Sequence, residues 1–141
     1  MLIMVKEQSY GAVCYKCDEN HHLLFLIEHM SLGHFSLPKG HIEANETPLE
    51  TTIREIKEET NLDVIVDTNF KRTITYSPRL GAIKDVTFFV AKITSNKVIA
   101  QKSEVQEVLF LPFDNALKTL THASDKDVLK AANDYILKHQ N

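Results

Sequence analysis

Residues 47–60 restrict the fold of this chain more than any other segment, because they carry the start signals of one helix. Thr47 is a residue type that caps helix N-termini, and Pro48 suits the first helical position. Glu50 completes a capping box with Thr47. The segment therefore predicts a helix over Pro48–Thr60 whose N-terminus is closely defined.

Three glutamates lie close together on this predicted helix. At about 100° per residue, Glu55, Glu58 and Glu59 fall on one face. The aliphatic residues fall on a different face, which we expect to pack on a sheet: Leu49, Ile53 and Ile56. Like charges on adjacent turns repel by about a few tenths of a kcal/mol per pair. Two interpretations follow: a solvated acidic face, or a site for a hard divalent cation such as Mg²⁺, which prefers carboxylate oxygens.

Outside this helix the sequence alternates predicted strands and helices. Strands are predicted at residues 9–17, 23–29, 62–66, 71–76, 86–93 and 107–111. Further helices are predicted at residues 113–120 and 125–139, and a loop at residues 33–41. The continuous apolar run of residues 86–91 is typical of a central strand. Strands mixed with separated helices predict an α/β sandwich, and the length suits a single domain over residues 1–141.

Charge and hydropathy narrow the classes of partner. The net charge of −3 and the pI of about 6.1 give no general attraction to nucleic acid or to anionic membranes. The N-terminal apolar run, residues 1–5, is too short for a signal sequence, and Lys6 and Glu7 follow at once. No apolar stretch approaches the roughly 18 residues that span a bilayer. We therefore expect a cytoplasmic protein without a membrane partner, and nucleic acid is disfavoured as a partner although a local basic patch is still possible.

Two cysteines, Cys14 and Cys17, form a C-x-x-C motif of the kind found in redox pairs and in half zinc sites. They fall on a predicted strand, where residues three apart point to opposite faces. The sequence has no second pair of cysteines to complete the four ligands of a structural zinc site. We therefore favour two ordinary strand cysteines.

The helix belongs to a longer motif. From Gly40 the sequence reads GHIEANETPLETTIREIKEETNL, which resembles the Nudix box, G-x5-E-x7-R-E-U-x-E-E-x-G-U, where U is aliphatic. The matching positions are Gly40, Glu46, Arg54, Glu55, Ile56, Glu58, Glu59 and Leu62. Asn61 stands where the family has Gly, but Asn ranks next to Gly for the left-handed backbone that ends a helix. The departure therefore affects helix termination and not a ligand.

The resemblance implies an α/β/α sandwich of the Nudix type with a mixed central sheet, and pyrophosphohydrolase activity that depends on Mg²⁺, with Mn²⁺ as the alternative ion. It implies that the metal ligands are Glu55, Glu58 and Glu59, with the Gly40 carbonyl beside them. Glu46 and Arg54 are implied as an ion pair that supports catalysis by orienting the loop against the helix. The alternative for this pair is a surface salt bridge worth about 0–1 kcal/mol.

Glu104 lies in a polar stretch ahead of the predicted strand at residues 107–111. An exposed loop carboxylate is one interpretation. In related Nudix enzymes a glutamate at the matching place reaches the metal cluster as a base or an extra ligand. On that resemblance we favour a catalytic role for Glu104.

Segments outside the box bear on the substrate. Residues 33–41, GHFSLPKGH, resemble the loop before the box in asymmetrical diadenosine tetraphosphate hydrolases. Four other parts of the chain resemble the corresponding parts of those enzymes: residues 70–72, residues 75–76, Lys84 and residues 103–104. This similarity implies a small-molecule nucleotide substrate, with diadenosine tetraphosphate cleaved to ATP and AMP. A long anionic phosphate chain needs cationic donors, and we expect them from Lys39, His34, Lys84 and Arg72.

Two tyrosines are candidates for base binding. By analogy with this subgroup, Tyr76 and Tyr135 are expected to stack on one adenine, at about 1–3 kcal/mol per stacked base. The alternatives are an ordinary half-buried helix residue for Tyr135 and an ordinary strand-edge lysine for Lys84. His34 and His41 are expected as loop histidines and not as metal ligands.

Three rival functions stay open at this point. Two are other Nudix activities, namely RNA 5′-end pyrophosphohydrolysis and the clearance of damaged nucleoside triphosphates. The absence of net basic charge disfavours RNA. The third is a Nudix module that senses a nucleotide without hydrolysing it, and such a module is expected to lose box carboxylates, none of which is lost here.

Overall fold

The computed structural model describes residues 4–139, so the first residues of the apolar N-terminal run lie outside the described part. The elements follow one another as β1 (Val5–Cys17), β2 (Leu23–Met30), β3 (Phe35–Ser36), β4 (Lys39–His41), α1 (Pro48–Thr60), β5 (Val64–Tyr76), β6 (Ala82–Ile93), β7 (Val105–Leu111), α2 (Phe113–Thr119) and α3 (Ala123–His139). Among these residues no helix is long and apolar enough to cross a membrane.

The strands form one mixed sheet with β1 near its middle. The order is β3-β2-β1-β6-β5, with β4 paired to β1 and β7 paired to β2. β1 runs parallel to β6, whereas its pairings with β2 and β4 are antiparallel, as are those of β5 with β6 and of β2 with β7. The predicted central strand at residues 86–93 is confirmed as part of β6, which lies between β1 and β5.

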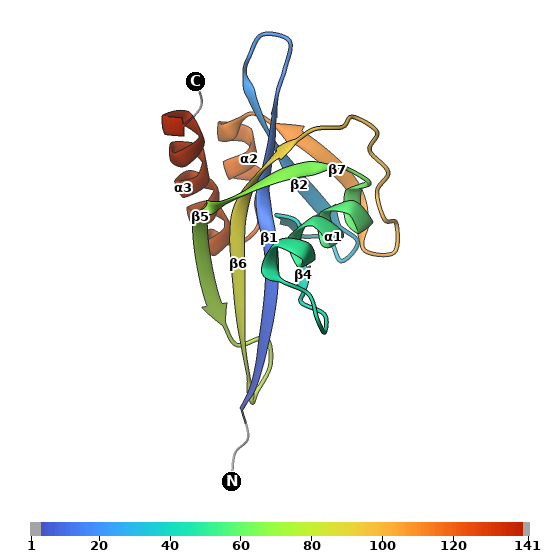
Figure 1. The fold of residues 1–141 in the computed structure, drawn as a ribbon, viewed down its shortest axis with the longest axis vertical. Coiled ribbons are helices and arrows are strands. Elements are labelled where there is room, and N and C mark those ends of the chain that lie inside the picture. Colours follow the sequence, from blue (N-terminus) through green and yellow to red (C-terminus); the bar gives the residue numbers. More distant parts are fainter. Residues whose placement is uncertain (1–3, 140–141) are drawn as a thin grey trace.

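Helices cover both faces of the sheet, with α1 on one side and α2 and α3 on the other (Figure 1). Successive strand residues point to opposite faces, and β1 shows the result. Val13 belongs to the apolar cluster under α2 and α3, whereas Ala12 and Cys14 belong to the cluster that contains Ile56 of α1. This arrangement confirms the predicted α/β sandwich with a mixed central sheet.

Two details of the predicted secondary structure were wrong. The predicted loop at residues 33–41 contains the short strands β3 and β4. Strands of two or three residues are too short to show an alternating pattern. The two strands predicted at residues 62–66 and 71–76 are one strand, β5, whose pairing with β6 shifts between Asp67 and Arg72. This irregularity interrupts the pairing with β6 without ending the strand.

The face of α1 that packs on the sheet also differs from the prediction. Leu49 and Ile53 are 40% and 42% exposed, and of the three aliphatic residues only Ile56 is buried. Thr52 and Thr60 are buried instead, and their hydroxyls donate to the carbonyls of residues 48 and 56 one turn earlier. These bonds satisfy the hydroxyls, so small polar residues can face the sheet.

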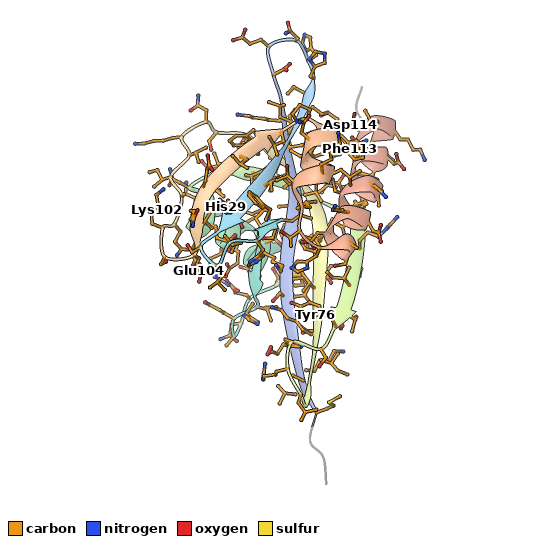
Figure 2. The ribbon with its side chains drawn as sticks, turned by 180° about the vertical axis from the view of Figure 1, so that it is seen from behind. His29, Tyr76, Lys102, Glu104, Phe113 and Asp114 are labelled. Atoms are coloured by element: carbon orange, nitrogen blue, oxygen red, sulfur yellow. The ribbon has the colours of Figure 1, made fainter. Side chains whose placement is uncertain are left out.

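The two cysteines behave as strand residues. Cys14 is buried and Cys17, at the end of β1, is exposed. Burial raises the pKa of the Cys14 thiol, which makes it a poor nucleophile and metal ligand. Tyr76 is the last residue of β5, and Figure 2 shows it on the other side of the view from Glu104.

Candidate active site

The ends of α1 are defined by local contacts. The Thr47 hydroxyl accepts a hydrogen bond from the Glu50 amide (3.1 Å), and the Glu50 carboxylate accepts one from the Thr47 amide (2.9 Å), so the predicted capping box is confirmed. Asn61 has φ 65°, which confirms the left-handed C-cap, and its side-chain amide donates to the Lys97 carbonyl (3.0 Å). The box glutamates therefore lie on a helix whose two ends are both anchored.

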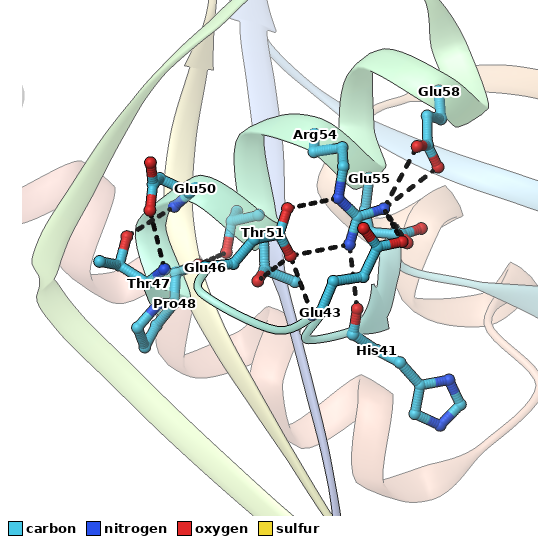
Figure 3. Close-up of polar contacts among 11 residues, drawn as sticks. His41, Glu43, Glu46, Thr47, Pro48, Glu50, Thr51, Arg54, Glu55 and Glu58 are labelled. Carbon is cyan, nitrogen blue, oxygen red and sulfur yellow. Dashed lines mark hydrogen bonds and ion pairs between the residues drawn. The ribbon is translucent and has the colours of Figure 1, made fainter.

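Arg54 connects the preceding loop to the carboxylates of α1 (Figure 3). Its guanidinium contacts both oxygens of Glu46, at 2.6 Å and 3.0 Å, so the predicted ion pair is present and bidentate. It also donates to the His41 carbonyl (3.0 Å), to Glu55 (2.8 Å) and to Glu58 (3.2 Å). The Arg54 guanidinium lowers the pKa of the Glu46 carboxyl to about 2. The loop and the helix are thus held together by one charged side chain.

Gly40 lies directly against the Glu55 carboxyl group. A β-carbon at position 40 would overlap all three atoms of that carboxyl group, so a larger residue would displace the Glu55 carboxyl group from its position. β4 holds Gly40 in place through its antiparallel pairing with β1, where Tyr10 is the partner. The close approach explains why this motif starts with glycine, and it puts the Gly40 backbone beside a predicted metal ligand.

Glu59 faces the sheet and meets a second buried carboxyl group, that of Glu28 on β2. The two side chains are 2% and 1% exposed. Burial raises the pKa of both groups, and their negative charges oppose each other. The sequence analysis did not assign Glu28 a role. The sequence did contain one signal, because Glu28 directly follows the apolar residues 23–27 of a predicted strand. A charged residue buried on such a strand needs a partner, since unpaired charges are rarely buried.

Glu55 and Glu104 complete the acidic group. Burial raises the pKa of Glu55, and the charge of Glu104 raises it further. Glu104 lies exposed in the turn ahead of β7, where its backbone carbonyl accepts a hydrogen bond from the Ser31 amide (2.8 Å). Figure 2 shows Glu104 in this loop with Lys102. Its charge also acts on Glu28 and Glu59, so this loop glutamate belongs electrostatically to the same cluster.

The donor set fits a hard divalent cation. It consists of carboxylate oxygens with a backbone carbonyl beside them, which are ligands that Mg²⁺ prefers. Glu28 Oε2 and Glu59 Oε1 are buried without a hydrogen-bond donor from the protein. Within residues 4–139 no group of three or more His, Cys, Asp or Glu side chains is arranged to hold a metal ion. Two of the predicted ligands, Glu55 and Glu58, accept hydrogen bonds from Arg54 in this structure.

A cavity of about 400 Å³ lies between β5 and the start of α3. It is lined by His34, Lys39, Ile74, Thr75, Tyr76, His122, Ser124 and Asp125. Three of these residues were predicted from the sequence as substrate-binding residues: His34, Lys39 and Tyr76. Lys84 is the strand partner of Tyr76, and burial and the charge of Lys39 lower its pKa. The structure therefore gathers four of the six predicted residues in one region.

Arg72 and Tyr135 lie elsewhere, in a second cavity of about 380 Å³. The Tyr135 hydroxyl donates to Asp67 (2.6 Å), and its ring stacks on His139 with a centroid distance of 4.1 Å. The Arg72 guanidinium lies 5.1 Å from the Phe70 ring. The structure thus does not bring the two tyrosines together, as one adenine between them would require.

Two further cavity residues, His122 and Asp125, were missed by the sequence analysis. The His122 ring lies 6.0 Å from the His34 ring. Asp125 is buried near the start of α3, and burial raises the pKa of its carboxyl group. Both occur in an ordinary polar stretch at a helix start, so no motif distinguished them.

The fold and the box define the class of protein. A profile of the NUDIX domain matches residues 8–132, so the chain belongs to the Nudix family of hydrolases. These enzymes act on nucleotide substrates and generally depend on a divalent metal ion.

Comparison with known proteins adds three relatives. The chain is 30% identical to the rat (Rattus norvegicus) asymmetrical bis(5′-nucleosyl)-tetraphosphatase over 84% of each protein. It is 33% identical to an 8-oxo-(d)GTP phosphatase of Mycolicibacterium smegmatis over 68% of this chain but only 29% of that longer protein. The crystal structure of a C. elegans Ap4A hydrolase binary complex has a similar fold, with a TM-score of 0.84, 24% identity, and 94% of this chain and 98% of that one covered.

Proposed function

We propose that this Nudix hydrolase is a Mg²⁺-dependent enzyme that cleaves diadenosine tetraphosphate to ATP and AMP. The observation that carries the proposal is a cavity lined by the half-exposed Tyr76 ring and by Lys39, which directly precedes Gly40, the first residue of the box. Lys39 lines this cavity, and its charge also acts on Glu28 in the acidic cluster. The similarity to the rat tetraphosphatase supports the same substrate.

The metal would be held by Glu55, Glu58 and Glu59, with the Gly40 carbonyl beside them. Bound Mg²⁺, or Mn²⁺ in its place, supplies charge neutralisation on phosphate oxygens and lowers the pKa of a bound water. Glu104 is the candidate general base, because its side chain is exposed in the turn ahead of β7 and its charge acts on Glu55. Arg54 and Glu46 act as positioning residues, because they hold the loop and the box helix in one arrangement.

The cavity supplies separate groups for the base and for the phosphates. Tyr76 offers a ring face that a nucleobase can stack on, and the Asp125 carboxyl group can bond a base amino group. Lys39, Lys84 and His34 supply positive charge or hydrogen-bond donors for a phosphate chain. The burial that lowers the pKa of Lys84 also strengthens its interaction with an anion.

The rival activities have less support. The similarity to the M. smegmatis 8-oxo-(d)GTP phosphatase favours a damaged nucleoside triphosphate as the second candidate. A net charge of −3 is unfavourable for binding RNA. All box carboxylates are retained, which argues against a module that only senses nucleotides.

A substrate panel tests the proposal. Diadenosine tetraphosphate, other dinucleoside polyphosphates, 8-oxo-dGTP, ordinary NTPs, ADP-ribose and 5′-triphosphate RNA are ranked by kcat/KM, with the products identified. We expect diadenosine tetraphosphate to rank first, to yield ATP and AMP, and to be left intact in EDTA. A higher rank for 8-oxo-dGTP or RNA would overturn the substrate, and binding without Mg²⁺-dependent hydrolysis would overturn the enzymatic function.

A further inference from the structure

Glu28 is the only acidic residue of β2, and its surroundings are those of a core residue. Its side chain is almost fully buried, and residues 25–27 before it are fully buried. Glu28 pairs with Ser36 of β3 on one side and with Val108 of β7 on the other. A carboxylate in such a place normally has an ion or several hydrogen-bond donors beside it.

Glu28 Oε2 has no hydrogen-bond donor in the part of the chain that the structure describes. Four buried side-chain oxygens there have no partner among N–H, hydroxyl and carbonyl groups: Ser9 Oγ, Glu28 Oε2, Ser36 Oγ and Glu59 Oε1. Three of the four belong to neighbouring side chains, because Glu28 is the strand partner of Ser36 and its carboxyl group lies beside that of Glu59.

Further carboxylates act on this pair. Glu55 and Glu104 add two negative charges that act on both Glu28 and Glu59, whereas Lys39 acts on Glu28 with one positive charge. A divalent cation takes oxygen ligands from several carboxylates at once. It would therefore satisfy the unpartnered oxygens and offset the clustered negative charge together.

We infer that Glu28 is a further carboxylate of the divalent-metal centre, contributed by β2 to a cluster whose other glutamates come mainly from α1. The inference rests on the proposed metal-dependent function and adds a residue that lies outside the Nudix box. Through Glu28 the metal centre is held by strand β2 of the sheet as well as by helix α1. Both the position of Glu59 and the charge that holds the cation then depend on Glu28, and ligand charge is one determinant of affinity for hard cations.

The test measures divalent-ion binding by the full chain without substrate. Glu28→Gln keeps the size of the side chain and removes its charge. Glu107→Gln is the matched control, because it removes one charge from an exposed position on the neighbouring strand β7. Mn²⁺ binding is followed by the EPR signal of the free ion, and Mg²⁺ binding by calorimetry. We expect Glu28→Gln to weaken binding about 10-fold or more, and Glu107→Gln to bind like the wild type.

Thermal melts in EDTA and in Mg²⁺ give a second readout. Glu28→Gln should melt at or above the wild-type temperature in EDTA, because a buried charge is gone. The rise in melting temperature on adding Mg²⁺ should be smaller than in the wild type, since less binding energy stabilises the folded state. If Glu28→Gln does not fold, Glu28→Leu replaces it in both assays, because an apolar side chain leaves no unpartnered oxygen.

The outcomes separate this inference from the function on which it rests. Unchanged Mn²⁺ affinity in folded Glu28→Gln would overturn the role of Glu28, while weakened binding by Glu58→Gln in the same assay would leave the metal-dependent function standing. A wild-type chain that binds neither Mn²⁺ nor Mg²⁺ would overturn both.

Discussion

Arg54 and Glu46 face each other through two hydrogen bonds, 2.6 Å from Nε to Oε2 and 3.0 Å from Nη2 to Oε1. The two residues are eight positions apart, one in the loop and one on α1. The same guanidinium contacts Glu55 and Glu58, so the geometry of the loop and that of two predicted metal ligands are set together. Charge-assisted, bidentate contacts of this kind are directional, and lysine cannot reproduce them.

The first prediction concerns the pH dependence of stability. The pKa of Glu46 is lowered from 4.5 to about 2, so its ionised form is favoured by folding. A lowered pKa gives stability that is present above pH 4.5 and is lost as the pH falls toward about 2. Glu46→Gln should therefore melt below the wild type at neutral pH, and the gap should close in that acidic range. Glu43→Gln, which alters a more exposed contact of Arg54, is the control and should show no such gap.

The second prediction concerns the metal ligands. Glu58 is 47% exposed and contacts Arg54 at 3.2 Å, so Glu58→Gln removes charge without disturbing the core. We expect kcat to fall by about 10²-fold or more while the melting temperature in EDTA changes little. Steady-state kinetics and melts on the same preparation check both parts. Near-normal turnover by the folded variant would show that Glu58 is not a ligand.

The third prediction concerns the C-cap of α1. Asn61 is left-handed, which favours glycine, but its side chain also donates to the Lys97 carbonyl. Asn61→Gly gains a relaxed backbone and loses a hydrogen bond worth about 0.5–1.5 kcal/mol, so the two effects should nearly cancel. Asn61→Val loses the same bond and strains the backbone, at about 2–3 kcal/mol in total. Thermal melts that rank Val above Gly would contradict this account.

The sequence was informative where local chemistry decides the structure. The capping box at Thr47, the left-handed Asn61 and the Arg54–Glu46 pair depend on short-range contacts and on motif spacing, and all three are present. The burial of Glu59 was not predictable from helix periodicity. Periodicity groups residues on faces, but the sheet selects which face is covered, and here the sheet itself contributes Glu28.

The two cavities show a second limit of sequence reasoning. Arg72 and Tyr76 are four residues apart on β5 and were assigned to one substrate site. Four residues of extended chain span about 13 Å, so neighbours on one strand can serve different cavities. Arg72 lies with Tyr135 under the end of α3, whereas Tyr76 lies with Asp125 near its start. Only the packing of α3 along the sheet separates these pairs.

The last prediction concerns Tyr76 and the substrate. If its ring stacks on a nucleobase, Tyr76→Ala should raise the KM for diadenosine tetraphosphate by about 10-fold or more, because a stacked base is worth about 1–3 kcal/mol. Tyr76→Phe should be nearly silent, since stacking needs the ring and not the hydroxyl. The tyrosine is 42% exposed, so the melting temperature of both variants should stay close to that of the wild type.

Inorganic tetraphosphate provides the matched substrate, because it has the phosphate chain and no base. Its hydrolysis should be indifferent to both Tyr76 variants. A tyrosine that only fills space predicts a different pattern, in which Tyr76→Ala lowers the melting temperature and weakens both substrates alike. Equal losses on the two substrates would therefore remove the stacking role of Tyr76. The dinucleotide substrate would then be supported only by the similarity to the rat tetraphosphatase and by Lys39 in the cavity.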